Sequence, residues 1–261
     1  MRPLRVVTFV LSMVGGCAHA ATAPQCTAVS GERRIPLLEL YTSEGCDSCP
    51  PTDKWLSELP GRGLGPERVV TLSFHVDYWD YIGWRDPYAQ ARFSERQRAA
   101  NARIGSRQIY TPQLMLNGRD FRGSGARNDI AGKLAELGST PPKASIRLTA
   151  TPGPAQMAVT GAWSATDAAT ARHAQGWLAL YENRLATEVR AGENRGKRLE
   201  HDFVVRDVAG PFPAGEIRHT FALDARWKRG DLGLAAFALD ARSGDALQAL
   251  ALTACRPGPA T

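Results

Sequence analysis

The stretch of this 261-residue chain that decides the fold is residues 35–51, which read IPLLELYTSEGCDSCPP. Its first part, 35–42, is an apolar run that predicts a buried strand, and residues 50–59 carry apolar side chains at helical spacing. Cys46 and Cys49 therefore lie at a strand-to-helix corner, where backbone N–H groups and the positive helix end favour a thiolate. The second cysteine, three positions on, can attack a mixed disulfide made by the first.

This corner predicts a redox site, and two other interpretations of the cysteine pair stay open. One is a purely structural disulfide, and the other is a metal site. Half of a zinc site is disfavoured because the sequence has no second C-x-x-C and no nearby pair of histidines. Ser48 is the expected N-cap of the helix, since Pro50 and Pro51 then fall in the first turn, where a missing N–H does no harm.

The first 20 residues have the pattern of a signal peptide. Residues 1–5 are basic, residues 6–14 are apolar, and residues 18–20 (AHA) form a cleavage signal. The apolar run is too short to span a bilayer, so we expect a periplasmic or secreted protein. The alternative is a lipoprotein, because Cys17 ends a VGGC sequence that resembles a lipobox. Attachment to a membrane is expected only if Cys17 is lipidated.

The number of cysteines agrees with export. The chain has 5 cysteines, and either cleavage or acylation takes Cys17 out of the count. The remaining even number suits an oxidising compartment. If Cys46 pairs with Cys49, then Cys26 is left for Cys255, and we predict a structural disulfide between the two ends of the mature chain. The alternative is two unpaired terminal thiols.

The composition is that of a globular protein and gives no sign of nucleic-acid binding. Hydrophobic residues make up 43% and charged residues 22% of the chain, and the net charge is +6. The basic residues are scattered along the sequence, and no stripe of aromatic residues interleaves them. We therefore expect no nucleic-acid partner.

Residues 33–140 predict an α/β region. A second buried strand is expected over 68–76 and a mostly helical segment over 87–104. Asn117-Gly118 between two short apolar runs is a strong hairpin signal, and a helix is expected over 126–137. The resulting order is β-α-β-α-β-β-α, with the cysteine pair at the first strand–helix junction.

This order and three stretches, 39–51, 75–84 and 110–113, resemble the thioredoxin-like superfamily. More specifically, they resemble a family of exported bacterial thioredoxin-like proteins whose biological role is unassigned. The resemblance implies a thioredoxin-like fold for 33–140, with a helical insertion. It also places Pro112, preceded by Thr111, in the position of the cis-proline that faces the dithiol, where a cis bond costs little.

The surroundings of the pair indicate a reductase or isomerase rather than a strong oxidant. Asp47 lies beside Cys46, and a neighbouring carboxylate opposes ionisation of a thiol. Glu39, on the strand leading to the site, is a candidate proton acceptor for Cys49. The alternative is a Glu39 carboxylate that points to solvent or pairs with an arginine.

The segment after the second strand is rich in aromatic and polar residues. In an open α/β sheet such a segment lines the ligand site, so His75 and Asp77 are candidates for contact with the dithiol. The alternative for His75 is a strand-end histidine bonded to the backbone. Trp79, Tyr81 and Trp84 suit a peptide or small-molecule surface, with packing in the core as the alternative.

Residues 143–255 change in character and predict an antiparallel β-sandwich-like domain. Short alternating runs are separated by turn residues, at 145–149, 156–160, 177–181, 203–206, 217–221, 234–237 and 249–252. Residues 192–197 are expected to form a hairpin loop. His201 and Asp202 are expected to be a surface pair, with a functional role as the alternative. We expect this domain to bind a partner or stabilise the chain.

Two classes of function follow. The first is an exported thiol–disulfide oxidoreductase without a cofactor, in which Cys46, expected to be the more exposed thiol, attacks and Cys49 resolves. Its partners would be exported protein thiols or disulfides, with a membrane electron donor as an option. The second is a non-catalytic binding module or a copper carrier that uses Cys46, Cys49 and His75, since thiolates suit Cu(I). The sequence has no Met-rich tract to support copper delivery.

Overall fold

The structure, a computed structural model, describes residues 25–122 and 127–253. The predicted signal peptide at 1–20, with Cys17, and the distal cysteine, Cys255, lie outside these residues. Cys26 begins the first strand. Because Cys255 lies outside the described residues, the disulfide between Cys26 and Cys255 stays a prediction. None of the helices in the described residues is long and apolar enough to cross a membrane.

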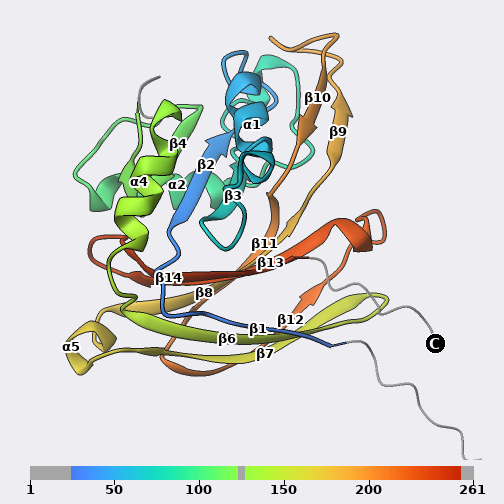
Figure 1. Cartoon of the computed structure of the whole chain (residues 1–261). Coiled ribbons are helices and arrows are strands. Elements are labelled where there is room, and N and C mark those ends of the chain that lie inside the picture. The colour runs from blue at the N-terminus through green and yellow to red at the C-terminus, as the bar shows by residue number, and fades with distance from the viewer. Residues whose placement is uncertain (1–24, 123–126, 254–261) are drawn as a thin grey trace, which may run out of the picture.

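The helices and strands follow one another in the order shown in Figure 1. The helices are α1 (Pro50–Ser57), α2 (Ala91–Arg103), α4 (Ile130–Gly138) and α5 (Ala168–Ala171). The first five strands are β1 (Cys26–Val29), β2 (Leu37–Thr42), β3 (Val70–His75), β4 (Gln113–Leu116) and β5 (Arg119–Asp120). The remaining strands are β6 (Ala144–Pro152), β7 (Gln156–Ala165), β8 (Ala174–Glu182), β9 (Leu185–Glu188), β10 (Arg198–His201), β11 (Val204–Phe212), β12 (Gly215–Ala222), β13 (Leu232–Asp240) and β14 (Ala246–Leu252).

One 8-stranded sheet joins the two predicted regions of the chain. Its strand order is β14-β13-β8-β11-β3-β2-β4-β5, so it runs without a break from the C-terminal strands to the strands beside the cysteine pair. β2 pairs with β3 in parallel and with β4 antiparallel. The link across the expected boundary near residue 143 is the parallel pairing of β11 with β3, where Val204 stands opposite Ser73.

Alternate side chains of β2 pack on opposite sides of this sheet. Leu38 and Leu40 pack with Leu56 of α1 in one buried cluster that also includes residues of α4. Tyr41 packs in another cluster with Phe93 of α2. This alternation is the two-residue period of a strand, and burial on both sides explains why β2 reads as a continuous apolar run.

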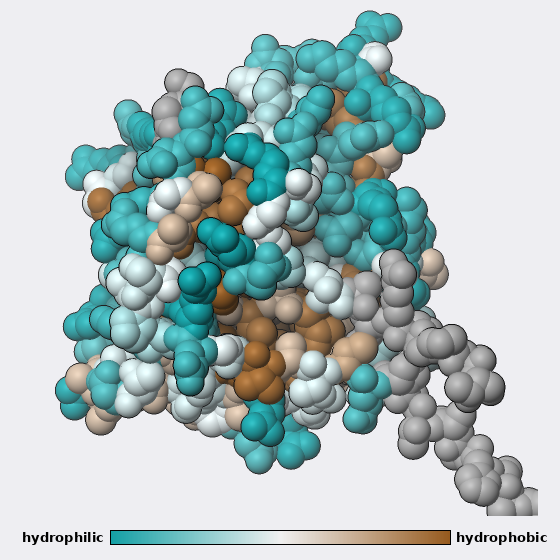
Figure 2. All heavy atoms as spheres, in the orientation of Figure 1, coloured by the Kyte–Doolittle hydropathy of each residue, from teal (hydrophilic) through white to brown (hydrophobic). Residues whose placement is uncertain are grey.

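The second sheet has the order β1-β6-β7-β12 and packs against β8 and β13. Its inward side chains alternate with exposed ones, as the pattern of β6 shows. The core between the sheets includes Ile146, Trp163, Leu178, Phe221 and Leu234. In Figure 2 the upper part of this face is mostly hydrophilic with smaller hydrophobic patches, and more hydrophobic side chains gather lower down, between the two sheets of Figure 1.

The individual strands and helices expected from the sequence are confirmed, with differences at their ends. Asn117 and Gly118 form the turn between β4 and β5 with φ values of 52° and 74°, as the hairpin signal requires. The segment expected to be helical from residue 87 becomes regular helix only at Ala91. The N-cap prediction is wrong, because Cys49 is the N-cap of α1 and no side chain caps it. The Ser48 hydroxyl instead lies 3.4 Å from the Cys46 sulfur.

Candidate functional site

Cys46 and Cys49 are joined by a disulfide where β2 passes into α1, with their Cα atoms 5.5 Å apart. The corner is held by its own backbone, since the N–H of Cys46 donates to the carbonyl of Ser43 at 3.1 Å. The N–H of Thr52 donates to the carbonyl of Cys49 at 2.8 Å. We expected Cys46 to be the more exposed thiol, and this is wrong, because both cysteines are fully buried.

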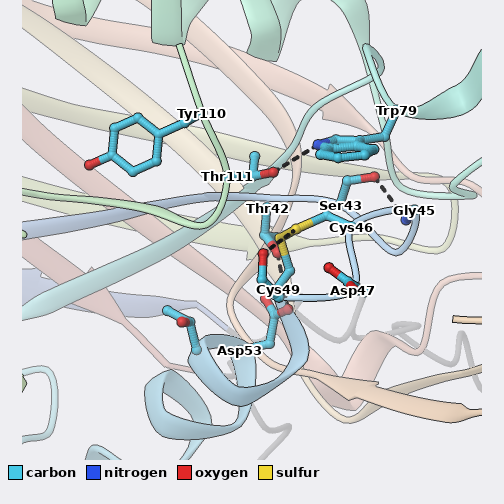
Figure 3. Close-up of a disulfide and its surroundings, with 12 residues drawn as sticks. Thr42, Ser43, Gly45, Cys46, Asp47, Cys49, Asp53, Trp79, Tyr110 and Thr111 are labelled. Atoms are coloured by element: carbon cyan, nitrogen blue, oxygen red, sulfur yellow. Dashed lines mark hydrogen bonds between the residues drawn. A yellow bond between two sulfur atoms is a disulfide. The ribbon is translucent and has the colours of Figure 1, made fainter. Parts of the chain in front are cut away.

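Trp79 and Thr111 lie on the side of the disulfide away from α1, as Figure 3 shows. The indole N–H of Trp79 donates to the Thr111 hydroxyl at 2.7 Å. Gly45 allows this close approach, because a Cβ at that position would lie only 2.9 Å from the Cβ of Trp79. The Thr111–Pro112 peptide bond is cis, as expected for a proline in this position.

The loop between β9 and β10 also covers the disulfide, although it belongs to the region that was expected to be a separate domain. The fully buried Asn194 uses its side-chain amide to donate to the carbonyl of Glu44 at 2.8 Å and to that of Cys46 at 2.9 Å. Beside it, the Glu193 carboxylate accepts from the N–H of Asp47 at 3.1 Å. The C-terminal region therefore completes the surroundings of the disulfide.

A buried carboxyl group lies one helical turn after Cys49. Asp53 of α1 accepts a hydrogen bond from the Thr42 hydroxyl at 3.0 Å, and Figure 3 shows it on the α1 side of the disulfide. Burial raises the pKa of Asp53, although His201, His75 and the Thr42 hydroxyl act in the opposite direction. Sequence reasoning missed this residue, and its signal was the four-residue spacing from Cys49 on one helix.

Two buried histidines and their carboxylate partners, Asp86 and Glu44, form a buried polar group together with Asp53. His75 Nδ1 is 2.7 Å from Asp86, and His201 Nε2 is 3.2 Å from Glu44. The two imidazole rings lie edge to face, with centroids 4.9 Å apart. Their other nitrogens, Nε2 of His75 and Nδ1 of His201, are buried without a hydrogen-bond partner among the described residues. The expectation that His201 lies on the surface is wrong, because β10 carries its side chain inward.

Asp202, the residue after His201, was expected with it on the surface and remains partly accessible. Its carboxylate accepts from the N–H of Arg184 at 2.9 Å. Of this predicted pair, only His201 joins the polar group beside the disulfide.

Glu39 does not serve the dithiol. Its side chain pairs with Arg96 of α2, with two hydrogen bonds of 2.9 and 2.7 Å to one carboxylate oxygen. Neighbouring residues of β2 point to opposite sides of the sheet, so Glu39 faces α2 while Thr42 faces α1. The role expected for Glu39 as a proton acceptor is therefore wrong, and the alternative of an arginine partner is confirmed.

Asp77 and the aromatic residues after β3 divide between several environments. Asp77 bonds to the Ser94 hydroxyl of α2, so it faces that helix. The indole of Trp84 donates to the Glu44 carboxylate at 2.9 Å, which ties it to the buried polar group. Tyr81 is 81% exposed and belongs to no core. Neither interpretation of the aromatic segment holds for all of its members.

The His75–Asp86 pair makes the stability of the protein depend on pH. Burial by itself would lower the pKa of His75, but the Asp86 carboxylate outweighs it, and the pKa is raised. The stabilisation is then complete below the ordinary pKa of about 6.5 and is lost as the pH rises through the raised value. Chemical denaturation should show the free energy of unfolding falling above pH 6.5 by up to about 1.4 kcal/mol per pH unit.

Two variants check this assignment. His75→Gln should lose this part of the pH dependence, while His219→Gln, a change in β12 of the second sheet, should keep it. Equal slopes in the two variants would show that another group is responsible.

The described residues contain no group of three or more His, Cys, Asp or Glu side chains arranged to hold a metal ion. Cys46, Cys49 and His75 therefore do not form a ready metal site in this disulfide-bonded state. The chemistry that this arrangement can perform is exchange of the disulfide, with buried carboxyl and imidazole groups close by to take up or release protons.

Comparison with known proteins connects the chain to a family of unknown function. Residues 37–238 match a family described as "Protein of unknown function (DUF1223)". No curated protein matches the sequence significantly. The matched range includes both cysteines and the β9–β10 loop, so it crosses the boundary expected near residue 143.

Two solved structures have a similar fold. Protein AGR_C_4864 from Agrobacterium tumefaciens is 26% identical, with 86% of this chain and 96% of that chain covered and a TM-score of 0.59. HBP35 of Porphyromonas gingivalis is 16% identical, with 88% of this chain and 78% of that chain covered and a TM-score of 0.63. The second similarity concerns the fold alone.

Proposed function

This chain belongs to the DUF1223 family of proteins of unknown function, and we propose that it is a thiol–disulfide oxidoreductase of the reductase or isomerase type. The observation that carries the proposal is the Cys46–Cys49 disulfide at the strand–helix corner, next to the cis Thr111–Pro112 bond. We further propose that residues 33–140 are thioredoxin-like and that residues 143–255 are a sandwich-like unit, joined through the shared sheet.

The exchange runs through two attacks. In the reduced protein the Cys46 thiolate attacks one sulfur of a substrate disulfide, and the other substrate sulfur leaves as a thiolate and takes up a proton. Cys49 then gives up its proton and attacks Cys46, which restores the disulfide and releases the second substrate sulfur. Two electrons and two protons pass to the substrate, and a dithiol donor must reduce the pair again.

Asp53 is the group best placed to handle the proton of Cys49. It lies one turn further along α1, it is buried, and its raised pKa favours the protonated form. A carboxyl group with a raised pKa is a better match for a thiol than one with its ordinary value. The Thr42 hydroxyl holds one carboxylate oxygen and so sets the orientation of the side chain.

The surroundings of Cys46 favour a reductase or isomerase. Asp47 follows it directly, and the Glu193 carboxylate bonds to the N–H of Asp47, so two acidic side chains lie on this side of the pair. Both oppose a thiolate at Cys46. Pro50 and Pro51, at the start of α1, offer no N–H groups that would stabilise one.

We propose an exported location, periplasmic or secreted, with residues 1–20 removed or with Cys17 lipidated. The substrates would then be thiols or disulfides of other exported proteins, and a membrane protein would be a suitable electron donor. Both proposals rest on the signal pattern and on the number of cysteines in the sequence.

The reduction potential of the Cys46–Cys49 pair tests the proposal. We expect a value between about −180 and −270 mV, the range of isomerases and reductases, together with reduction of insulin by the protein in the presence of a dithiol. A potential near about −120 mV would instead indicate a strong oxidant. Without insulin reduction or thiol oxidation, a tight Cu(I) complex that is lost in Cys46→Ser would support the copper carrier.

A further inference from the structure

The hairpin of β9 and β10 rises beside α1 and brings its loop, residues 189–197, to the cysteine corner (Figure 1). The base of this loop is anchored, since Val189 and Leu199 are buried. Gly192, with φ of 71°, packs against the segment after β3, and a Cβ there would lie 3.2 Å from Ile82 and from Trp84. The loop is therefore held in place on more than one side.

Asn194 is the residue of this loop that contacts the corner directly. One amide nitrogen donates to two backbone carbonyls, that of Glu44 at 2.8 Å and that of Cys46 at 2.9 Å. Its own oxygen accepts from Lys197 at 2.8 Å, which fixes the orientation of the amide. The Asn194 amide thus donates to the backbone carbonyl of Cys46 in the same way as a backbone N–H of a bound polypeptide could.

Both cysteines are fully buried beneath this cover and the Trp79–Thr111 contact. A partner can reach a sulfur only if part of the cover moves. Movement of Asn194 leaves the carbonyls of Glu44 and Cys46 without its hydrogen bonds, and a buried acceptor that loses its donor raises the free energy of the open state. A partner that brings its own N–H groups removes this cost, whereas one without them does not.

We propose that Asn194 occupies the binding position of the substrate backbone, and that the substrate is an extended, unfolded polypeptide segment whose N–H groups replace it at Glu44 and Cys46. The inference rests on the proposed function and names its substrate class. Tyr81 lies in the same segment of the chain as Trp79 and Trp84, and its exposed ring offers an aromatic surface to the side chains of such a polypeptide.

The exchange with an unfolded dithiol peptide balances without another reagent. A peptide thiolate attacks the sulfur of Cys46, and Cys49 leaves as a thiolate and takes up a proton. The second peptide thiol loses its proton and attacks the peptide sulfur of the mixed disulfide, and Cys46 leaves as a thiolate and takes up a proton. The peptide ends with a disulfide, and the protein gains two electrons and two protons.

The rate of this reaction, measured with the oxidised full-length protein, tests the proposal. The probes are an unstructured peptide with two cysteines, the same peptide with N-methyl groups on the residues that flank the attacking cysteine, and dithiothreitol. Methylation removes the donors and keeps the thiols, so we expect it to slow the peptide about 10-fold, as the loss of two hydrogen bonds predicts. Equal rates, within about twofold, for the two peptides would overturn the proposal.

Asn194→Ala gives a second, independent measurement. It removes both bonds from the closed state, so the rates with the peptide and with dithiothreitol should both rise by about 10-fold. The matched control is Asn183→Ala, which also removes a partly buried amide that bonds two backbone groups. These are the N–H of Phe203 and the carbonyl of Asp231, neither of which belongs to the cysteine corner. A rise in Asn183→Ala as large as in Asn194→Ala would mean that general loosening exposes the sulfurs, and would overturn the proposal.

These outcomes are separate from a failure of the proposed function. Insulin reduction and the reduction potential report on turnover, whereas the single exchange of the oxidised protein reports on access to the disulfide. If the protein fails to reduce insulin but still reacts more slowly with the methylated peptide, the proposed binding position stands and the proposed enzymatic function fails.

Discussion

Replacing Cys49 by Ser should abolish turnover, with a loss of at least about 100-fold in insulin reduction, and should leave Cys46 in mixed disulfides with its partners. The reason is that Cys46 lies toward the Trp79–Thr111 side of the site, while Cys49 lies at the start of α1 beside Asp53 (Figure 3). Without Cys49 nothing within the pair resolves the first adduct. Non-reducing electrophoresis and mass spectrometry of the exported protein would identify the trapped partners.

The control for this experiment is Cys46→Ser, which should trap few partners or none. If the two variants trap partners equally, the assignment of the attacking and resolving thiols is wrong. If Cys49→Ser accumulates no adducts and the unaltered protein reduces no disulfide, the enzymatic assignment itself fails.

Glu39→Ala should cause a large loss of stability, about 3–5 kcal/mol in the free energy of unfolding. The side chains of Glu39 and Arg96 are only 6% and 15% exposed. The guanidinium carbon of Arg96 lies 5.1 Å from the ring centroid of Phe74 and 5.5 Å from those of Trp177 and Phe237. These rings come from both parts of the large sheet. Removal of the carboxylate therefore leaves a buried, unpaired charge where α2 covers the junction of the two parts.

Two controls separate this charge effect from the loss of packing. Glu188→Ala breaks the pair with Arg198, in which both side chains are more than half exposed, and should cost less than about 1 kcal/mol. The double change Glu39→Leu with Arg96→Leu should recover much of the stability, because it removes both charges together. A cost for Glu39→Ala no larger than that for Glu188→Ala would show that the buried pair contributes little.

The difference between sequence and structure is clearest at the C-terminal region. The strands there follow from their alternating patterns, and each expected run is present as β6, β7, β8, β11, β12, β13 or β14. The pairing of β11 with β3 does not follow, because pairing between strands distant in the chain depends on edges that only the assembled sheet provides. The expected separation into two units missed this junction for that reason.

The buried polar group is a second example. His75 and the cysteine pair were recognised from local patterns. His201 and Asn194 lie more than 140 residues after Glu44 and Cys46, and they meet them only in the folded protein. A short alternating run such as β10 does not reveal which of its sides faces the interior. The exposure of Cys46 was misjudged for the same reason, since the cover belongs to distant segments.

What the sequence by itself determined is therefore local: the strand–helix corner that holds Cys46 and Cys49, the Asn117-Gly118 turn, and the periods of the strands and helices. These depend on backbone preferences and on the burial of neighbouring side chains. The tertiary structure alone decided that Glu39 serves Arg96, that His201 turns inward to Glu44, and that Asn194 covers the disulfide. Those roles depend on which side chains share a low-dielectric interior, and that is settled only when distant elements pack together.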